Sequence, residues 1–240
     1  MIDVALCPSE IRRVSSRDLS GTTAVVFDVL RASSSMILAL QAGALEIIPV
    51  STVEEARERK AKDPEILLAG ERGGLPLVGF DLGNSPDEFA TTLGRKVVMT
   101  TTNGTVAIQA VRHASQVLIG ALLNLTALAD YLLQQQPRDL LLVCAGTGEE
   151  FSLEDAVAAG ALVAKVAKES QLTDSAILVR LLYERVGDDL EKWLRQTKNG
   201  RALQKIGKGP DIARCGRLSA TEVIGHLHQG AIVRLGNSKE

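Results

Sequence analysis

Aromatic residues are scarce in this sequence: four Phe, two Tyr and one Trp make up 3% of 240 residues. We therefore expect a core of Leu, Val, Ile and Ala, and no aromatic platform on which nucleic-acid bases would stack. Lysine and arginine total 27 against 29 aspartates and glutamates, and they form no basic run. The sequence thus lacks the electrostatic footprint of a nucleic-acid-binding protein.

Cysteine is limited to Cys7, Cys144 and Cys215, which are widely separated. This spacing argues against a disulfide framework and a CxxC metal site. No apolar run approaches the roughly 20 residues of a membrane span, and no charged segment with an apolar signal core is present. We therefore expect no membrane partner and a cytoplasmic location.

Several familiar phosphate and nucleotide motifs are also missing. The GK pair of a P-loop is followed by Gly209 where Ser or Thr is required, and Phe151 occupies a position where the dinucleotide fingerprint needs Gly or Ala. A cysteine phosphatase would need arginine at Glu150, and Leu30 excludes the DxD start of aspartyl-nucleophile phosphatases. The three histidines show no metal-ligand spacing.

Strand-like and helix-like stretches alternate along the chain. The predicted strands are Ile2–Leu6, Val25–Phe27, Glu46–Val50, Ile66–Ala69, Lys96–Thr100, Val117–Leu122, Leu140–Cys144 and Ala231–Leu235. The predicted helices are Ser35–Ala42, 53–62 with Ser51 as N-cap, Val106–His113, Thr126–Gln135, Val157–Lys165 and the helical stretch Thr173–Gly200; Arg12–Ser20 is a polar connection. This alternation is typical of an α/β fold in which helices cover both faces of a parallel-rich sheet.

The stretch VVFDVLRASSS places Asp28 at the carboxyl end of a buried strand, with Arg31, Ser33 and Ser34 just before a helix. Free N–H groups at a helix N-terminus favour an anion, and open α/β sheets bind ligands at such junctions. We interpret the stretch as a phosphate site with a nearby metal carboxylate. The alternative is a serine N-cap with a local ion pair between Asp28 and Arg31.

Two further polar turns follow strands. Glu71 and Arg72 lead into a long loop rich in glycine, which is typical of a functional segment; the alternative is a surface excursion in which the two residues pair. The stretch TTTNGT brings Asn103, Gly104 and Thr105 to a helix start, where they could bind phosphate oxygens or simply cap the helix.

A fourth polar turn, CAGTGEEFSLEDA, follows the last of the strong strands. Ser152 and Asp155 resemble a capping box, whereas Glu154 and Asp155 are also natural oxygen ligands for Mg²⁺. Glu149 and Glu150 are equally well explained as solvated side chains. Because polar turns at one edge of a sheet converge, we expect these segments to form one pocket.

The motifs FDVLRASSS, GERGG with GFDLGNSP, TTTNGT, and CAG with SLEDA, in this order, resemble those of the 2-phosphosulfolactate phosphatase, or ComB-like, family. The resemblance covers nearly the whole chain, including Asn199–Ile212. It implies a single domain over residues 1–240 with a three-layer α/β/α fold and a parallel-rich or mixed sheet. It further implies Mg²⁺-dependent hydrolysis of 2-phospho-3-sulfolactate to 3-sulfolactate and phosphate, a step of the coenzyme M biosynthesis type.

The resemblance and the residues together suggest a role for each candidate in a phosphatase site. Asp28 is the first choice as metal ligand, followed by Glu71 or Asp155. The expected catalytic residues are Asp28, Arg31, Arg72 and Glu154. The guanidinium groups of Arg31 and Arg72 would contact the phosphate or the substrate's other anionic groups, and Glu154 would act as general acid or indirect ligand. The expected phosphate contacts are Ser33, Ser34, Asn103, Gly104 and Thr105.

The partner that these roles imply is a small anionic phosphorylated substrate, and the sequence leaves the oligomeric state open, a homo-oligomer included. Two other functions also stay open at this stage. One is a phosphatase for another small phosphorylated acid, because the sequence does not show which loops select the leaving group. The other is a non-catalytic phospholigand-binding protein, although an anion binder gains nothing from carboxylates beside a phosphate unless a metal lies between them.

Overall fold

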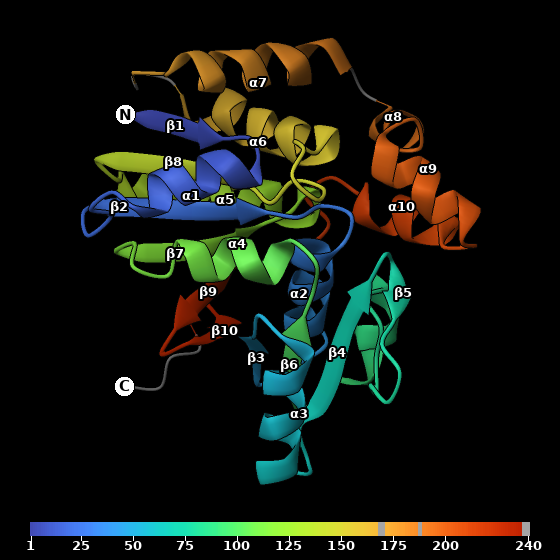
Figure 1. The fold of residues 1–240 in the computed structure, drawn as a ribbon. Helices are drawn as coiled ribbons and strands as arrows, with labels where there is room; N and C mark the ends of the chain where they lie inside the picture. The colour runs from blue at the N-terminus through green and yellow to red at the C-terminus, as the bar shows by residue number, and fades with distance from the viewer. Residues whose placement is uncertain (168–170, 187–188, 237–240) are drawn as a thin grey trace.

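The computed structural model describes residues 1–167, 171–186 and 189–236 (Figure 1). Its strands are β1 (Ile2–Ala5), β2 (Thr22–Phe27), β3 (Glu46–Pro49), β4 (Leu67–Arg72), β5 (Leu75–Pro76), β6 (Lys96–Thr100), β7 (Gln116–Gly120), β8 (Asp139–Cys144), β9 (Gly225–His228) and β10 (Ala231–Arg234). Its α-helices are α1 (Pro8–Ser15), α2 (Ala32–Gln41), α3 (Val53–Lys62), α4 (Gly104–Ala110), α5 (Leu125–Gln135), α6 (Leu153–Val166), α7 (Asp174–Val186), α8 (Leu190–Leu194), α9 (Lys198–Lys205) and α10 (Gly209–Cys215). Two 3₁₀ turns are η1 (Pro86–Thr91) and η2 (Leu122–Asn124).

The strands form one mixed ten-stranded sheet in the order β1-β8-β2-β7-β9-β10-β3-β6-β4-β5. Strands β1, β8, β2 and β7 form one parallel block, and β3, β6 and β4 form another. The hairpin β9–β10 joins the two blocks through antiparallel pairings on both sides. The predicted α/β class with a mixed sheet is confirmed.

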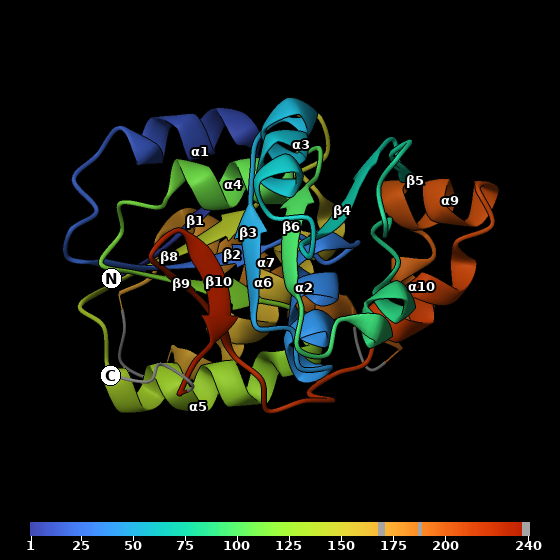
Figure 2. The same ribbon diagram turned by 90° about the horizontal axis from the view of Figure 1, so that it is seen from below.

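The antiparallel pairings reverse the strand direction, so the two parallel blocks run in opposite senses along the sheet. In a flat sheet their carboxyl ends would lie at opposite edges. The sheet instead turns sharply at the hairpin, so that β3, β6 and β4 run across the direction of the first block in both views (Figures 1 and 2). The carboxyl ends of β2 and β6 consequently meet beside the start of α2.

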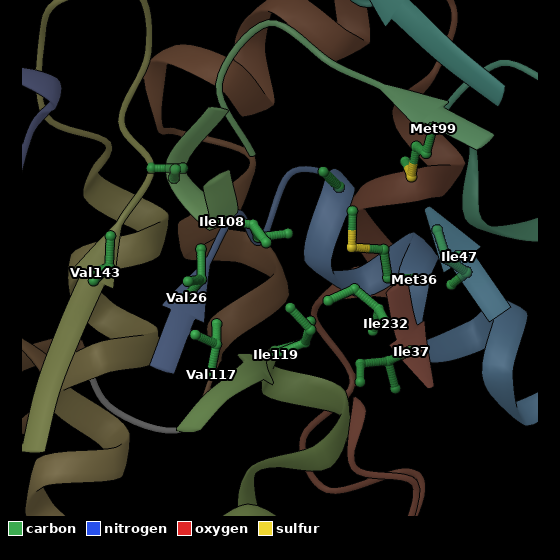
Figure 3. Packing of buried hydrophobic residues seen from close by; sticks show 14 of the residues in the cluster. Val26, Met36, Ile37, Ile47, Met99, Ile108, Val117, Ile119, Val143 and Ile232 are labelled. Carbon is green, nitrogen blue, oxygen red and sulfur yellow. The ribbon is translucent and has the colours of Figure 1, made fainter. Parts of the chain in front are cut away.

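The first block has hydrophobic cores on both faces, which follows from the period-two alternation of its strands. In β2, Ala24 and Val26 face one core, which includes residues of α1, α2 and α4 (Figure 3). Val25 and Phe27 face the other, which includes α5, α6 and α7. Helices therefore cover this block on both sides, in the three-layer arrangement.

Some predicted boundaries change. Helix α2 begins at Ala32 instead of Ser35, so the serines lie inside its first turns. The N-cap of α3 is Thr52, whose hydroxyl accepts the Glu55 N–H at 3.1 Å, in place of the predicted Ser51.

The polar connection predicted from residue 12 to 20 contains the second half of helix α1, which starts at Pro8 and buries Ile11 and Val14 on one face. The helical stretch predicted from Thr173 to Gly200 is three helices in which Gly200 lies near the start of α9, not at a helix end; its residues 187–188 lie outside the described residues. No helix in the described part of the chain has both the length and the apolar character required to span a membrane.

Candidate active site

A cavity of about 290 Å³ lies where β2, β4, β6 and β8 end, and helix α9 closes one side of it. All four polar turns singled out in the sequence contribute to its wall. The residues that line it are Asp28, Leu30, Arg31, Glu71, Gly73, Gly74, Asn84, Thr102, Asn103, Gly146, Thr147, Gly148, Lys198, Asn199, Ala202, Leu203 and Ile206.

Asp28 extends from the end of β2 into this cavity. Its Oδ1 accepts the N–H of Ala32 at 3.1 Å, so the carboxylate also caps the start of α2. Helix α4 begins directly against it, since a Cβ at Gly104 would lie 2.5 Å from Oδ2 of Asp28. Burial, followed by repulsion from Glu71 and Glu154, raises the pKa of Asp28 to about 7, although the hydrogen bond from Ala32 and, less strongly, the charge of Arg31 oppose the rise.

Glu71 is the second carboxylate that lines the cavity, and only 8% of its surface is exposed. Its Oε1 accepts the backbone N–H and the hydroxyl of Thr102, at 2.9 and 3.0 Å. Its Oε2 accepts the N–H of Gly74 at 2.7 Å. These hydrogen bonds orient the carboxylate and connect the turns that follow β4 and β6.

Asp155 and Glu154 lie behind the cavity wall at the start of α6, and neither lines the cavity. Asp155 accepts N–H groups from Val29 and Gly146, at 2.8 and 3.2 Å, and burial together with the charges of Asp28 and Glu154 raises its pKa well above the ordinary value. The predicted capping box is half formed, because Ser152 caps Asp155 but the Asp155 carboxylate bonds elsewhere.

The guanidinium group of Arg31 is buried and committed to protein partners. It forms an ion pair with Asp211 at 2.5 Å and donates to Ser85 Oγ at 3.2 Å and to the Gly74 carbonyl at 2.7 Å. The local pair with Asp28 that was considered from the sequence is therefore replaced by a pair with Asp211, 180 residues further along the chain. This interaction joins α10 to the start of α2.

Arg72 and most of the predicted hydroxyl groups lie outside the cavity wall. The Arg72 guanidinium donates to Thr100 Oγ1 at 3.0 Å. Ser33 Oγ accepts the N–H of Asp28 at 3.1 Å, and Ser34 Oγ donates to the Val29 carbonyl at 2.8 Å. These groups therefore stabilise the turns that carry the cavity residues.

The turn after β6 contributes Asn103 to the cavity, whereas Thr105 is buried. The hydroxyls of Thr101 and Thr105 each accept the other residue's N–H at 3.1 Å, which caps α4. The Asn103 amide donates to the carbonyls of Ala145 and Gly148, at 3.3 and 3.1 Å, and accepts the Gly148 N–H at 3.3 Å. Asn103 therefore also links the turns after β6 and β8.

Sequence reasoning assigned no role to four residues that the structure brings to the site: Asn84, Lys198, Asn199 and Asp211. The Oδ1 atom of Asn84 is buried without a hydrogen-bond partner among the described residues, although the residue lines the cavity. Asn199 donates to Glu154 Oε1 at 2.5 Å and to Thr147 Oγ1 at 2.6 Å. The only signal for these residues was that their segments belong to the ordered motif set.

The described residues contain no cluster of three or more His, Cys, Asp or Glu side chains with the spacing of a metal site. The carboxylates on the cavity wall are those of Asp28 and Glu71, and the wall residues with amide or hydroxyl oxygens are Asn84, Thr102, Asn103, Thr147 and Asn199. Cys144, at the end of β8, is fully buried and does not line the cavity, and burial raises the pKa of its thiol well above the ordinary value, which argues against a cysteine nucleophile there.

Residues 8–230 match the family model described as 2-phosphosulpholactate phosphatase. Three bacterial proteins, each named "Probable 2-phosphosulfolactate phosphatase", are similar over most of their length. That of Carboxydothermus hydrogenoformans is 36% identical, covering 97% of this chain and 96% of its own. Those of Thermotoga maritima and Deinococcus radiodurans are 39% and 38% identical, covering 90% and 89% of this chain and 90% of each relative.

Proposed function

The chain belongs to the 2-phosphosulfolactate phosphatase family, and we propose that it hydrolyses 2-phospho-3-sulfolactate to 3-sulfolactate and phosphate with the help of Mg²⁺. The names of the relatives support the substrate, and the cavity at the strand ends supports phosphate-ester chemistry. This reaction is a step of the coenzyme M biosynthesis type.

The observation that carries the metal proposal is the charge of the cavity. Asp28 and Glu71 face it, and Glu154 and Asp155 lie immediately behind. The two cations on the wall, Arg31 and Lys198, are each paired with another carboxylate, Asp211 and Glu150. The phosphate of the substrate carries about two negative charges at neutral pH, and its carboxylate and sulfonate add to them. An anion of this kind would be repelled by the cavity unless a cation lies between the carboxylates and the phosphate.

The donor set fits Mg²⁺, which is a hard cation that takes oxygen ligands and keeps several waters. Asp28 and Glu71 would hold it from the protein side, and Asn84, whose Oδ1 is buried without a hydrogen-bond partner among the described residues, belongs to the same cavity wall. When bound there, Mg²⁺ would neutralise charge on the phosphate and on the departing alkoxide oxygen.

The remaining groups of the chain would position the substrate and exclude water. Asn103 lines the cavity, and its hydrogen bonds to Ala145 and Gly148 would hold the turns after β6 and β8 around the phosphate. Arg31, held by Asp211, would maintain the shape of the turn after β2 and add a fixed positive charge beside Asp28. Glu154, whose carboxylate is buried and bonded to Asn199, would help to fix the position of α9.

The direct test measures phosphate release from 2-phospho-3-sulfolactate, with Mg²⁺ and with EDTA, for the wild type, Glu71→Gln and Glu65→Gln. Glu65 is the matched control because its side chain is 89% exposed. We expect metal-dependent turnover that Glu71→Gln lowers by at least about tenfold and Glu65→Gln leaves unchanged. Turnover in EDTA equal to that with Mg²⁺ would refute the metal proposal. Turnover only with another phosphorylated acid would refute the proposed identity of the substrate.

A non-catalytic phospholigand-binding role makes a different prediction. Such a protein would bind the phosphorylated acid equally well in EDTA and would release no phosphate. Isothermal titration with the same substrate, carried out alongside the release assay, separates the two functions.

A further inference from the structure

We propose that Lys198 binds the sulfonate, one of the two anionic groups of the substrate that are not hydrolysed, at the mouth of the cavity. The inference rests on the proposed phosphatase function and adds a residue that selects the substrate. It follows from a comparison of the cations that line the cavity, from the position of α9, and from the ion pair that Lys198 forms in the absence of substrate.

Arg31 and Lys198 are the cationic side chains among the described residues that line the cavity. Arg31 is buried and bonded to Asp211, Ser85 and Gly74, so moving its charge to a ligand would leave Asp211 unpaired in the interior. Lys198 pairs with Glu150 at 2.6 Å, and both side chains are more than half exposed, at 63% and 68%. Exposed pairs of this kind exchange partners at little cost, so the Lys198 ammonium is available to a ligand.

The backbone of Lys198 is nonetheless held in place. Lys198 is the first residue of α9, whose N-cap Thr197 accepts the N–H of Gly200 at 3.1 Å. The next residue, Asn199, is tied to Glu154 and Thr147 across the cavity wall. A flexible side chain on a fixed backbone can reach a ligand group without rearrangement of the helix.

The charges in the first turn of α9 are unfavourable for the helix but suited to an anionic ligand. Acidic residues stabilise the first turn of a helix, and cations there are unfavourable. The first turn of α9 contains no acidic residue and contains Lys198 and Arg201. The other residues on this side of the cavity wall are Asn199, Ala202 and Leu203 of α9 and Ile206 directly after it, which offer no charge. An anionic group that enters on this side therefore meets Lys198.

Glu150 then competes with the substrate for Lys198. The ion pair lowers the pKa of Glu150, mainly through its hydrogen bond with Lys198, so this carboxylate is ionised at neutral pH. Removing its charge should leave Lys198 free and strengthen substrate binding. Removing the charge of Lys198 should weaken binding of the sulfonated substrate only.

The test compares Lys198→Met, Glu150→Gln and the wild type on 2-phospho-3-sulfolactate and on 2-phospholactate, which has hydrogen in place of the sulfonate. Lys205→Met is the matched control, since Lys205 is exposed on the same helix and does not line the cavity. We expect Lys198→Met to raise KM for the sulfonated substrate about tenfold with little change in kcat, and to leave KM for phospholactate unchanged. Glu150→Gln should lower KM for the sulfonated substrate.

Equal effects of Lys198→Met on both substrates would overturn the proposal, as would an effect on kcat alone. If the wild type releases phosphate from neither compound, the proposed function fails, and titration calorimetry with 3-sulfolactate and lactate in Mg²⁺ then decides the role of Lys198. Weaker binding of sulfolactate by Lys198→Met than by the wild type would support it. Equal binding, or none by either protein, would overturn it.

Discussion

Replacing Asp28 by asparagine should stabilise the metal-free protein while abolishing its activity. The fold raises the pKa of this partly buried carboxyl from the ordinary value of 3.8 to about 7. When the pKa of an acid is higher in the folded state, its protonated form stabilises the fold. This contribution is complete below the pKa of the unfolded state and is lost as pH rises through the pKa of the folded state. Each pKa unit is equivalent to about 1.4 kcal/mol, so the difference between the two pKa values corresponds to on the order of 4 kcal/mol of unfolding free energy.

Thermal unfolding in EDTA at pH 4.5 and pH 8 measures this difference. At pH 8 the Asp28→Asn variant should unfold about 10 °C above the wild type, and at pH 4.5 the two should nearly coincide. Mg²⁺ should raise the melting temperature of the wild type at pH 8 and have a smaller effect on the variant. Asp130→Asn, on the exposed side of α5, is the control. Equal melting temperatures at pH 8, or an active variant, would refute this account of Asp28.

Two other substitutions test the packing around the site. Gly104→Ala would place a Cβ 2.5 Å from the Asp28 carboxylate, so it should lower the free energy of unfolding by roughly 1–3 kcal/mol and remove most of the activity. Gly21→Ala is the control, because a Cβ there has nothing within 4 Å and should change neither the stability nor the activity. Urea unfolding measures the stability, and phosphate release measures the activity. Arg31→Met leaves Asp211 buried and unpaired and should cost about 3–5 kcal/mol in urea unfolding, part of which Arg31→Met/Asp211→Asn should restore.

The strands of this fold were predictable because most of them are short runs of β-branched and aliphatic residues. Strand β9, with the sequence GHLH, lacks that signal and was missed. Helix α1 was missed because it has 8 residues and buries only Ile11 and Val14. The reversal of the second parallel block was also not predictable, since it depends on pairings between strands far apart in sequence.

The site was predictable as a set of segments, but the orientation of its side chains was not. A hydroxyl that follows a strand can bind a ligand or a backbone group, and the two uses share one sequence pattern. Ser34 and Thr105 use their hydroxyls for the backbone, whereas Asp28 and Glu71 reach the cavity. Lys198 lacked any local signal because its role depends on where α9 packs.

The turn of the sheet at hairpin β9–β10 determines whether this site exists. Strands β2 and β6 run in opposite senses, so their carboxyl ends, which carry Asp28 and Asn103, would separate if the sheet were flat. The hairpin connects to the second block through a single registered pair, Ile232 with Ile47, and both side chains are fully buried in the core that α2 shares (Figure 3). Packing around α2, more than backbone hydrogen bonding, therefore holds the two halves of the site together.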